Sequence, residues 1–487
     1  MYMEKYNFWF VVGSQFLYGP EVLDTVAERA AEMAEKMNES GLLPCKVIYK
    51  VTAKTPEEIT QVIKEANYDD SCAGIITWMH TFSPSKMWID GLKTIAKPIL
   101  HFSTQFNMAL PYDMIDMDFM NLNQSAHGDR EHSHIYALMR KSRKEVVGHW
   151  QDEDAINEIR TWVSAAKAFA QGSTLRVCRF GDNMRDVAVT EGNKVTTQAK
   201  LGWSVDYYGI GDLAAEINNV TDEEADKLVE EYKNVYTVVT NDIDSIKEQA
   251  KYEIALERFL AKTDCTAFTT NFQDLHGLKQ LPGLSAQRLM AKGYGFGAEG
   301  DWKTAALTRA MKIMSENDST AFMEDYTYNL TKDNQAILGA HMLEVCPTIA
   351  DGDVKLDVQP LGIGGKEPPA RLIFNAKAGN AIAVSLVDLG NRLRLICAEV
   401  ECITAEKPMP KLPVASAMWK PLPNFKDGVK AWLLSGGAHH SVLSYSLTKE
   451  HIIDFARMAG IECVVIDKNT NINDFELKLM LGDAAWK

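Results

Sequence analysis

The chain has 487 residues, a formal net charge of −15, and 46% apolar and 24% charged residues. Single hydrophobic cores stop growing near about 250–300 residues, so we expect roughly two to four domains. The balance of apolar and charged residues is that of a globular protein. The negative charge disfavours nonspecific binding to nucleic acid or to anionic membranes.

The eight cysteines are scattered and form no C-x-x-C pair. Most lie in apolar runs such as "LRVCRF" and "ECVVID", which is typical of reduced structural thiols in a reducing compartment. The first residues, "MYMEKYNFWFVVGSQ", predict a strand rather than a signal peptide, because a basic leader and a cleavage site are lacking. No run approaches the roughly 18 apolar residues of a membrane span. We therefore expect a cytoplasmic protein.

The first third of the chain alternates strands and helices. Residues 6–13 predict a buried strand and 20–41 an amphipathic helix, followed by a second strand at 45–50. Thr55 is placed to cap the next helix, with proline at its first position and a glutamate three residues after the cap. This alternation predicts a parallel sheet covered by helices, which we assign to a domain spanning 1–172.

A second α/β unit begins near "STLRVCRFGDN" and continues through the helix "TDEEADKLVEEYK" and the strands "VYTVVT" and "CTAFTTN". After about residue 320 the pattern changes to short apolar runs, which predict antiparallel strands of a barrel or sandwich. They are "VKLDVQPL", "ARLIFNA", "AIAVSLVDL", "RLRLICAEVECI" and "VKAWLLSG", followed by one helix, "TKEHIIDFARMAG", and a polar tail. We thus predict two doubly wound, Rossmann-like α/β domains, 1–172 and 173–320, and a β-rich, barrel-like domain, 321–487.

The segment "GYGFGAEG" (293–300) has the G-x-G-x-x-G spacing of dinucleotide-binding proteins. The pattern before it is helical, whereas that motif requires a preceding strand, so we regard the match as weak. A flexible glycine-rich loop would instead present Glu299 as an oxygen donor to a ligand. For Asp301 a simpler role is favoured, as the cap of the helix that follows.

Three further side chains interrupt apolar runs. Glu324 lies within "AFMEDYTYNL" and His341 within "LGAHMLEVCP". Carboxylates are rarely placed among apolar residues unless they are paired or bind metal, although a surface strand with alternate wet residues is the plainer alternative. A lone histidine in such a run is more often a satisfied core residue than a ligand. A second histidine in a similar setting, at 439 or 440 of "LLSGGAHHSVLS", favours a ligand role. Adjacent strand residues face opposite sides, so these two should differ in role.

Two glutamates and two histidines would suit a divalent ion of intermediate hardness, such as Mn²⁺, Co²⁺ or Mg²⁺. Six-coordination would leave two positions for a bidentate oxygen substrate. A closed structural zinc site would more often use cysteine. A rival cluster, His127, Glu131 and His134, would align on one helix face, but a solvated helix start capped by Ser125 is the simpler interpretation.

The blocks "VVGSQFLYG", "AEGDWKTAAL", "FMEDYTY", "LGAHMLEVCP" and "SGGAHHSVLS", in this order along the whole chain, closely resemble the L-arabinose isomerase family. The resemblance implies a cytoplasmic aldose–ketose isomerase with two α/β domains and a β-barrel-like domain, a hexamer that uses Mn²⁺. Its metal ligands fall on Glu299, Glu324, His341 and His440, so that His439 is expected to face the other side. Two details depart from the family pattern: Asn329 replaces a histidine of many members, and the segment between the two glutamates is slightly short.

The resemblance also places substrate contacts on Gln15, Tyr18, His127 and Phe272, in a sugar site that lies between subunits. It implies conversion of L-arabinose to L-ribulose, with D-galactose as an alternative substrate. Glu299 and Glu324 are the expected acid–base pair for an enediol mechanism, with a metal-assisted hydride shift as the alternative. Two other classes of protein are alternative interpretations of the sequence: a two-lobed sugar-binding protein and an NAD-dependent dehydrogenase.

Overall fold

The computed structural model describes residues 5–486 and divides the chain into two compact units, Met1–Ala170 and Gln171–Lys487. The second unit holds both the central and the C-terminal segments of the sequence, whose apolar residues form one continuous core. The boundary predicted between those segments, at 320 and 321, stays a prediction. Within residues 5–486, no helix is long and apolar enough to cross a membrane.

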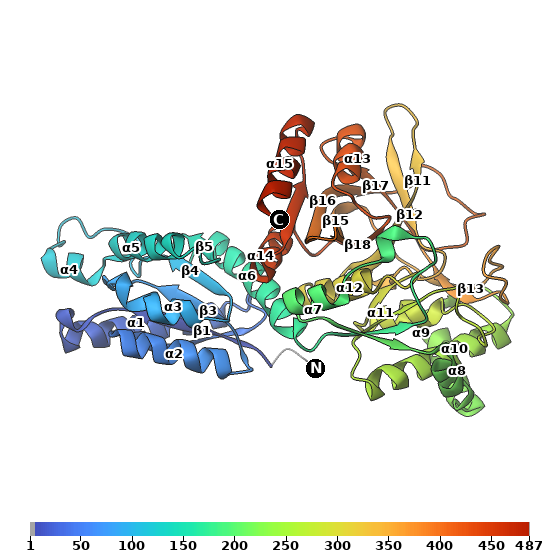
Figure 1. The fold of residues 1–487 in the computed structure, drawn as a ribbon, viewed down its shortest axis with the longest axis horizontal. Coiled ribbons are helices and arrows are strands. Elements are labelled where there is room, and N and C mark those ends of the chain that lie inside the picture. Colours follow the sequence, from blue (N-terminus) through green and yellow to red (C-terminus); the bar gives the residue numbers. More distant parts are fainter. Residues whose placement is uncertain (1–4, 487) are drawn as a thin grey trace. The chain divides into compact units, whose positions relative to one another are not determined.

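The first unit is a five-stranded parallel sheet with the strand order β2-β1-β3-β4-β5 and with helices on both faces (Figure 1). Its central strands β1 and β3 are almost completely buried, as expected for a sheet covered on both sides. The Thr55 side chain caps α2 by accepting a hydrogen bond from the backbone N–H of Glu58, as predicted. The elements are β1 (Asn7–Gly13), α1 (Pro20–Glu39), β2 (Lys46–Ala53), α2 (Pro56–Tyr68), β3 (Cys72–Trp78), α3 (Ile89–Thr94), β4 (Ile99–Ser103), α4 (Met117–Leu122), α5 (Ser125–Leu138), β5 (Lys144–Val147) and α6 (Glu153–Gly172).

The second unit begins with a four-stranded parallel sheet in the order β10-β9-β6-β7. Together with the first sheet it confirms the predicted pair of Rossmann-like α/β folds. Its elements are β6 (Arg176–Phe180), α7 (Lys194–Leu201), β7 (Ser204–Tyr208), α8 (Ile210–Asn218), α9 (Asp222–Val235), α10 (Ile243–Lys262), β9 (Ala267–Thr270), α11 (Leu284–Ala291), β10 (Gly295–Gly297) and α12 (Trp302–Met314).

The C-terminal strands form a closed barrel, as the sequence predicted. Six antiparallel strands follow one another in the order β15-β18-β11-β12-β17-β16, and pairing of β16 with β15 closes the ring. β19 (Glu462–Ile466) adds in parallel to β16. The barrel strands are β11 (Thr320–Asn329), β12 (Ala336–Ala340), β15 (Gly379–Asp388), β16 (Leu393–Ile403), β17 (Ser416–Pro421) and β18 (His440–Ser444).

Several C-terminal segments differ from the prediction. The run "VKAWLLSG" belongs to helix α13 (Phe425–Leu434), which begins where Asn424 accepts a hydrogen bond from the backbone N–H of Asp427. That N-cap and a helical apolar spacing outweigh the strand-like composition. After α14 (Lys449–Ala459), the segment expected to be a polar tail forms β19 and α15 (Ile472–Ala485). The strands β13 (Lys355–Val358) and β14 (Ala370–Ile373) pair with β8 (Thr237–Val238) in a separate small sheet.

The glycine-rich segment before Glu299 is strand β10 and a tight turn, so the predicted flexible loop is wrong. A Cβ on Gly295 would lie 2.2 Å from the backbone oxygen of Ala305, and one on Gly297 would lie 2.5 Å from that of Asp301. The glycines therefore let helix α12 pack directly on β10. Helix α11 precedes the segment, as expected, which removes the context that a dinucleotide-binding motif needs.

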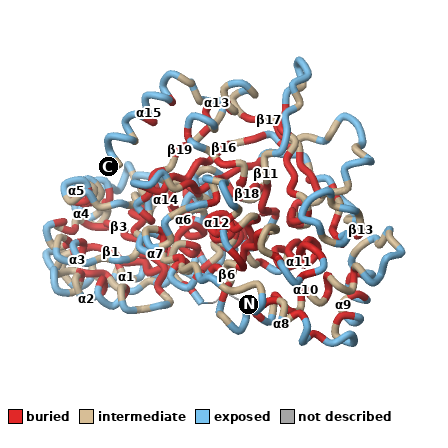
Figure 2. Tube along the Cα trace, turned by 45° about the vertical axis from the view of Figure 1, so that its right-hand side comes forward, coloured by how far each residue is buried: buried red, intermediate tan, exposed pale blue. Residues whose placement is uncertain are grey.

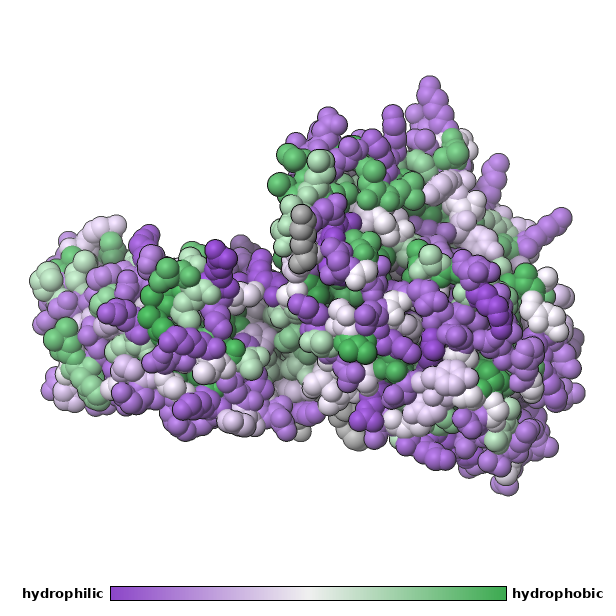
Figure 3. Space-filling model, in the orientation of Figure 1, coloured by the Kyte–Doolittle hydropathy of each residue, from purple (hydrophilic) through white to green (hydrophobic). Residues whose placement is uncertain are grey.

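Buried residues concentrate in the strands of the parallel sheets and, in the second unit, in helix α12 and the strands beside it (Figure 2). Every residue of α12 except Arg309 is buried, including Trp302 and Lys303. Hydrophilic side chains cover most of the face drawn in Figure 3, with apolar groups scattered among them. Helix α12 is thus the rigid element on which the following site is built.

Candidate active site

A cavity of about 280 Å³ opens in the second unit where strand ends of the central sheet face barrel strands. Met184 follows β6, Phe272 follows β9 and Glu299 follows β10, so each lies past the carboxyl end of a parallel strand, where α/β sheets bind ligands. The barrel contributes Glu324 and Tyr326 from β11, and His341 and Glu344 after β12.

Strand register brings the barrel residues together. Glu324 lies opposite His440 of β18 on one side and opposite Ala340 of β12 on the other, which places His341 beside it. Nε2 of His341 is 3.8 Å from Oε2 of Glu324, and the ring centroids of His341 and His440 are 5.9 Å apart. Three of the four predicted ligands therefore lie on adjacent strands or directly after one, although they are far apart in sequence.

Glu299 reaches the same group from the central sheet. Its φ of 60° is in the left-handed region, which is costly for a residue with a Cβ and persists only where the surrounding structure holds it. Gly300 follows with φ 77°, where a Cβ would lie 2.6 Å from the Cα of Asn183. The backbone oxygen of Gly300 accepts a hydrogen bond from the Asn183 side chain at 3.1 Å. This tight turn holds the Glu299 carboxylate 3.8 Å from Nε2 of His440.

The expectation that His439 faces away from the site is wrong. Its Nε2 lies 3.6 Å from Oε2 of Glu299, and its ring centroid is 4.3 Å from that of His440. Strand β18 begins only at His440, so the alternation of strand side chains does not apply to residue 439. The two histidines still differ, because the His439 side chain is 33% exposed and that of His440 is fully buried.

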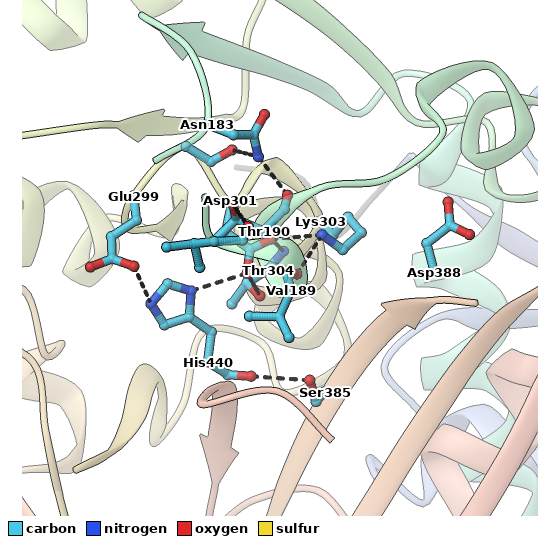
Figure 4. Close-up of polar contacts among 12 residues, drawn as sticks. Asn183, Val189, Thr190, Glu299, Asp301, Lys303, Thr304, Ser385, Asp388 and His440 are labelled. Carbon is cyan, nitrogen blue, oxygen red and sulfur yellow. Dashed lines mark hydrogen bonds and ion pairs between the residues drawn. The ribbon is translucent and has the colours of Figure 1, made fainter. Parts of the chain in front are cut away.

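Each buried histidine has a carboxylate behind it. Nδ1 of His440 is 3.1 Å from Oδ2 of Asp301, and Nδ1 of His341 is 2.5 Å from Oε2 of Glu344 (Figure 4 shows the first pair). Asp301 also caps helix α12 through the backbone N–H of Thr304, as predicted, and pairs with buried Lys303. Asp301 therefore has a second contact that its sequence position did not indicate.

The carboxylates and imidazoles of the site stabilise each other's charged forms. Burial alone would raise the pKa of Glu299, but the neighbouring imidazoles, His439 first among them, hold it below its usual value. Burial would lower the pKa of His341, yet Glu344, Glu324 and Glu299 raise it to about 9. The imidazoles and carboxylates are thus strongly coupled, which is typical of a catalytic or metal-binding site.

The arrangement fits a divalent cation. Glu299, His439 and His440 offer ligand atoms within 4.8 Å of one another. Nε2 of His440 is buried and has no hydrogen-bond partner among residues 5–486. A buried, unpaired imidazole nitrogen aimed at a carboxylate is costly without a ligand. Since Nδ1 is engaged by Asp301, Nε2 is free to bind a metal, as in carboxylate–histidine–metal sites. Glu324 and His341 supply further oxygen and nitrogen donors.

The other predicted substrate contacts lie in two places. Phe272 lines the cavity described above. In the first unit, the hydroxyl of Tyr18 accepts hydrogen bonds from Gln15 at 3.4 Å and Gln124 at 3.2 Å. Gln15 also donates to the backbone oxygen of Phe82, whose ring stacks on His127. This group follows the ends of β1 and β3, the topological switch point of the first sheet.

The rival cluster gains no support as a metal site. His127, Glu131 and His134 lie on α5 as predicted, but they are not among the side chains that converge closely enough to share an ion within residues 5–486. The predicted capping role of Ser125 is wrong, because the N-cap position is Gln124 and the Ser125 hydroxyl has no partner in that range. Sequence reasoning missed Met184, Tyr326 and Glu344. Only Glu344 carried a signal, an acidic residue three positions after His341.

Fold and site together define an α/β protein with a carboxylate–imidazole centre at the mouth of a barrel. Three domain families match the chain: the L-arabinose isomerase N-terminal domain at residues 2–174, its central domain at 176–317 and its C-terminal domain at 319–462. L-arabinose isomerases from Clostridium beijerinckii and Geobacillus stearothermophilus are each 53% identical, over 100% of this chain and 99% of theirs. The chain belongs to the L-arabinose isomerase family and is an isomerase. A sugar-binding protein of a Legionella pneumophila transporter aligns with 12% identity over 64% of this chain and 94% of that protein, at a TM-score of only 0.15.

Proposed function

We propose that this protein interconverts L-arabinose and L-ribulose, and that D-galactose is an alternative substrate. The observation that carries the proposal is a cavity lined by two glutamates, each 3.8 Å from an imidazole: Glu299 from His440 and Glu324 from His341. Two carboxylates with different surroundings are the groups that a proton transfer between neighbouring sugar carbons needs. Family membership supplies the substrate, since the relatives are named for L-arabinose.

We propose Glu299, Glu324, His341 and His440 as ligands of one divalent cation, Mn²⁺ in preference to Co²⁺ or Mg²⁺. Mixed carboxylate and imidazole donors suit an ion of this hardness. When bound, such an ion supplies a Lewis acid that stabilises negative charge on adjacent substrate oxygens. Asp301 and Glu344 are buried and contact Nδ1 of the two imidazoles, which keeps each ring in an orientation that turns Nε2 toward the glutamates.

The glutamates move the protons. One of the pair removes the proton from C2 of the open-chain aldose and returns it at C1 of the ketose, while the other exchanges protons with the sugar hydroxyls. Phe272 and Met184 give the cavity an apolar wall that excludes water from the reacting carbons.

Isomerisation in heavy water separates this path from a hydride shift. Because the abstracted proton exchanges with solvent on a carboxylate, we expect deuterium at C1 of L-ribulose, detected by proton NMR of the product after partial conversion. A direct hydride shift carries the C2 hydrogen to C1 without exchange. Product that contains no deuterium at C1 would rule out the enediol path.

Replacing Glu344 by glutamine should weaken Mn²⁺ binding about 10–100-fold, because the loss of an outer partner of a ligating histidine has this typical effect. The amide keeps the size of the side chain but can donate to Nδ1 of His341, which favours the tautomer protonated at Nε2. Titration calorimetry of the metal-free protein measures the change. Exposed Glu367 provides the matched control as Glu367→Gln. Equal affinities in both variants would remove Glu344 from the metal site.

We further propose a cytoplasmic homo-hexamer in which subunits share active sites. The group formed by Gln15, Tyr18 and His127 lies in the first unit, whereas the proposed metal ligands lie in the second. The resemblance to L-arabinose isomerases, whose sugar site lies between subunits, supports a role for the group in the site of a neighbouring copy. All eight cysteines are free, which agrees with a reducing compartment. A mass other than that of six chains in light scattering would contradict the hexamer.

A further inference from the structure

The first unit contains a second cavity, which the proposed catalytic reaction does not use. It measures about 710 Å³, within the range of small-molecule sites. It lies past the carboxyl ends of β4 and β5, against helix α5. Its polar lining consists of four hydroxyl side chains, two amides, two carboxylates, one guanidinium and one imidazole: Ser103, Thr104, Ser125, Ser133, Gln105, Asn107, Asp129, Glu145, Arg130 and His149.

One of the carboxylates is held from behind by a buried chain of hydrogen bonds. Nε2 of His101 lies 2.9 Å from Oδ1 of Asp129, and Nδ1 of the same ring lies 3.0 Å from the hydroxyl of Thr77. His101 is completely buried, whereas the Asp129 side chain is 13% exposed. The carboxylate is therefore fixed in position at the cavity wall, as preorganised binding groups are.

Three residues of the cavity lining also carry buried side-chain polar atoms that lack a hydrogen-bond partner in the described part of the chain. The hydroxyls of Thr104 and Ser125 and the amide oxygen of Asn107 are buried and have no hydrogen-bond partner among residues 5–486. Thr104 and Ser125 are only 5% and 3% exposed. All three atoms are closed to solvent, so they are unsatisfied groups just behind the cavity surface rather than atoms that a ligand touches.

The lining defines the chemistry of that ligand. The charge of Glu145 is already paired with Arg143, at 2.5 Å, and Glu145 also accepts a hydrogen bond from Ser133 at 3.0 Å. Asp129 is paired with His101, so neither carboxylate calls for a cation. Arg130 and His149 also line the cavity, and Arg130 donates to the backbone oxygen of Ala126. Arg143 and Arg130 balance the charges of the two carboxylates, and the mixture of hydrogen-bond donors and acceptors matches a neutral molecule with several hydroxyls.

We propose that this cavity is a second, noncatalytic binding site for a neutral polyhydroxylated ligand of monosaccharide size. Asp129 and Glu145 accept hydrogen bonds from the ligand's hydroxyls, and other polar side chains of the lining complete the network: Ser103, Ser133, Gln105, Arg130 and His149. Every residue of the site belongs to the first unit. A test of this binding site is therefore independent of the proposed metal centre in the second unit.

Two substitutions test the site in the full-length protein. Val147 lines the cavity at the end of β5 and is 74% exposed, so Val147→Trp should fill the opening without disturbing the core. Asp129→Asn removes the charged acceptor while keeping an oxygen for His101. Leu138→Trp, on the same unit and 68% exposed but outside the cavity lining, is the matched control.

The probe is radiolabelled L-arabitol, which cannot be isomerised, in equilibrium dialysis against protein treated with a chelator. We expect saturable binding that weakens at least about tenfold in Val147→Trp and Asp129→Asn and is unchanged in Leu138→Trp. Far-UV circular dichroism confirms that each variant is folded. The proposal is overturned if the wild-type chain does not bind the polyol, if Val147→Trp binds it as Leu138→Trp does, or if putrescine, a diamine, binds in its place.

Discussion

Glu324→Gln is expected to lower kcat/KM for L-arabinose by at least about a thousandfold, in line with the loss of an acid–base group. Glutamine has the same size and can occupy the same place opposite His440 in the sheet, but it can neither take up a proton nor carry a negative charge toward a cation. The fold should be unaffected, because Glu324 is partly exposed to the cavity rather than sealed in the core. Initial rates of ketose formation, with circular dichroism as a check of folding, measure the effect.

Glu401→Gln is the control for this experiment. Glu401 is an exposed residue of β16 in the same barrel, so this substitution changes the same charge without touching the cavity. Its activity should equal that of the unaltered enzyme. If Glu324→Gln retains activity within about tenfold of the control, Glu324 has no part in proton transfer.

The second large effect concerns the adjacent histidines. His440→Asn should weaken Mn²⁺ binding at least about 100-fold, because loss of a direct ligand exceeds the effect of losing an outer partner. His439→Asn should change the affinity by less than about tenfold, since its partly exposed ring lies at the edge of the group. Electron paramagnetic resonance of free Mn²⁺ gives both affinities.

One result of the two histidine substitutions would contradict the assignment of His440 as the ligand. Glu299 is almost equally close to both rings, at 3.6 and 3.8 Å, so distance alone does not distinguish them. The distinction depends on burial and on the Asp301 contact of His440. If His439→Asn loses the metal and His440→Asn keeps it, the assignment of the ligand is reversed.

Much of the architecture could be predicted from the sequence because it depends on local signals. Apolar strands alternating with capped helices predicted the parallel sheets, and the Thr55 cap appears as expected. The closed barrel was predictable as a class, but its strand order was not, since pairing such as β15 with β16 and β18 depends on contacts far apart in sequence. Composition failed at α13, where a run of apolar residues suited strand and helix alike.

For the candidate site, the sequence predicted the residues but not how they come together. Glu299, Glu324, His341 and His440 stood out because polar residues in apolar or glycine-rich surroundings are unusual, and the family resemblance completed the set. Their convergence is a result of sheet register, which no local pattern encodes. The contacts of Asp301 and Glu344 with the imidazoles, and the position of His439, likewise required the structure.

Anomalous diffraction from crystals of the protein grown with Mn²⁺ tests the central assignment most directly. We expect one strong peak per chain, within about 2.0–2.6 Å of oxygen atoms of Glu299 and Glu324 and of Nε2 of His341 and His440, as oxygen and nitrogen ligands require. A peak elsewhere, or one out of reach of any of these four side chains, would contradict the proposed metal centre.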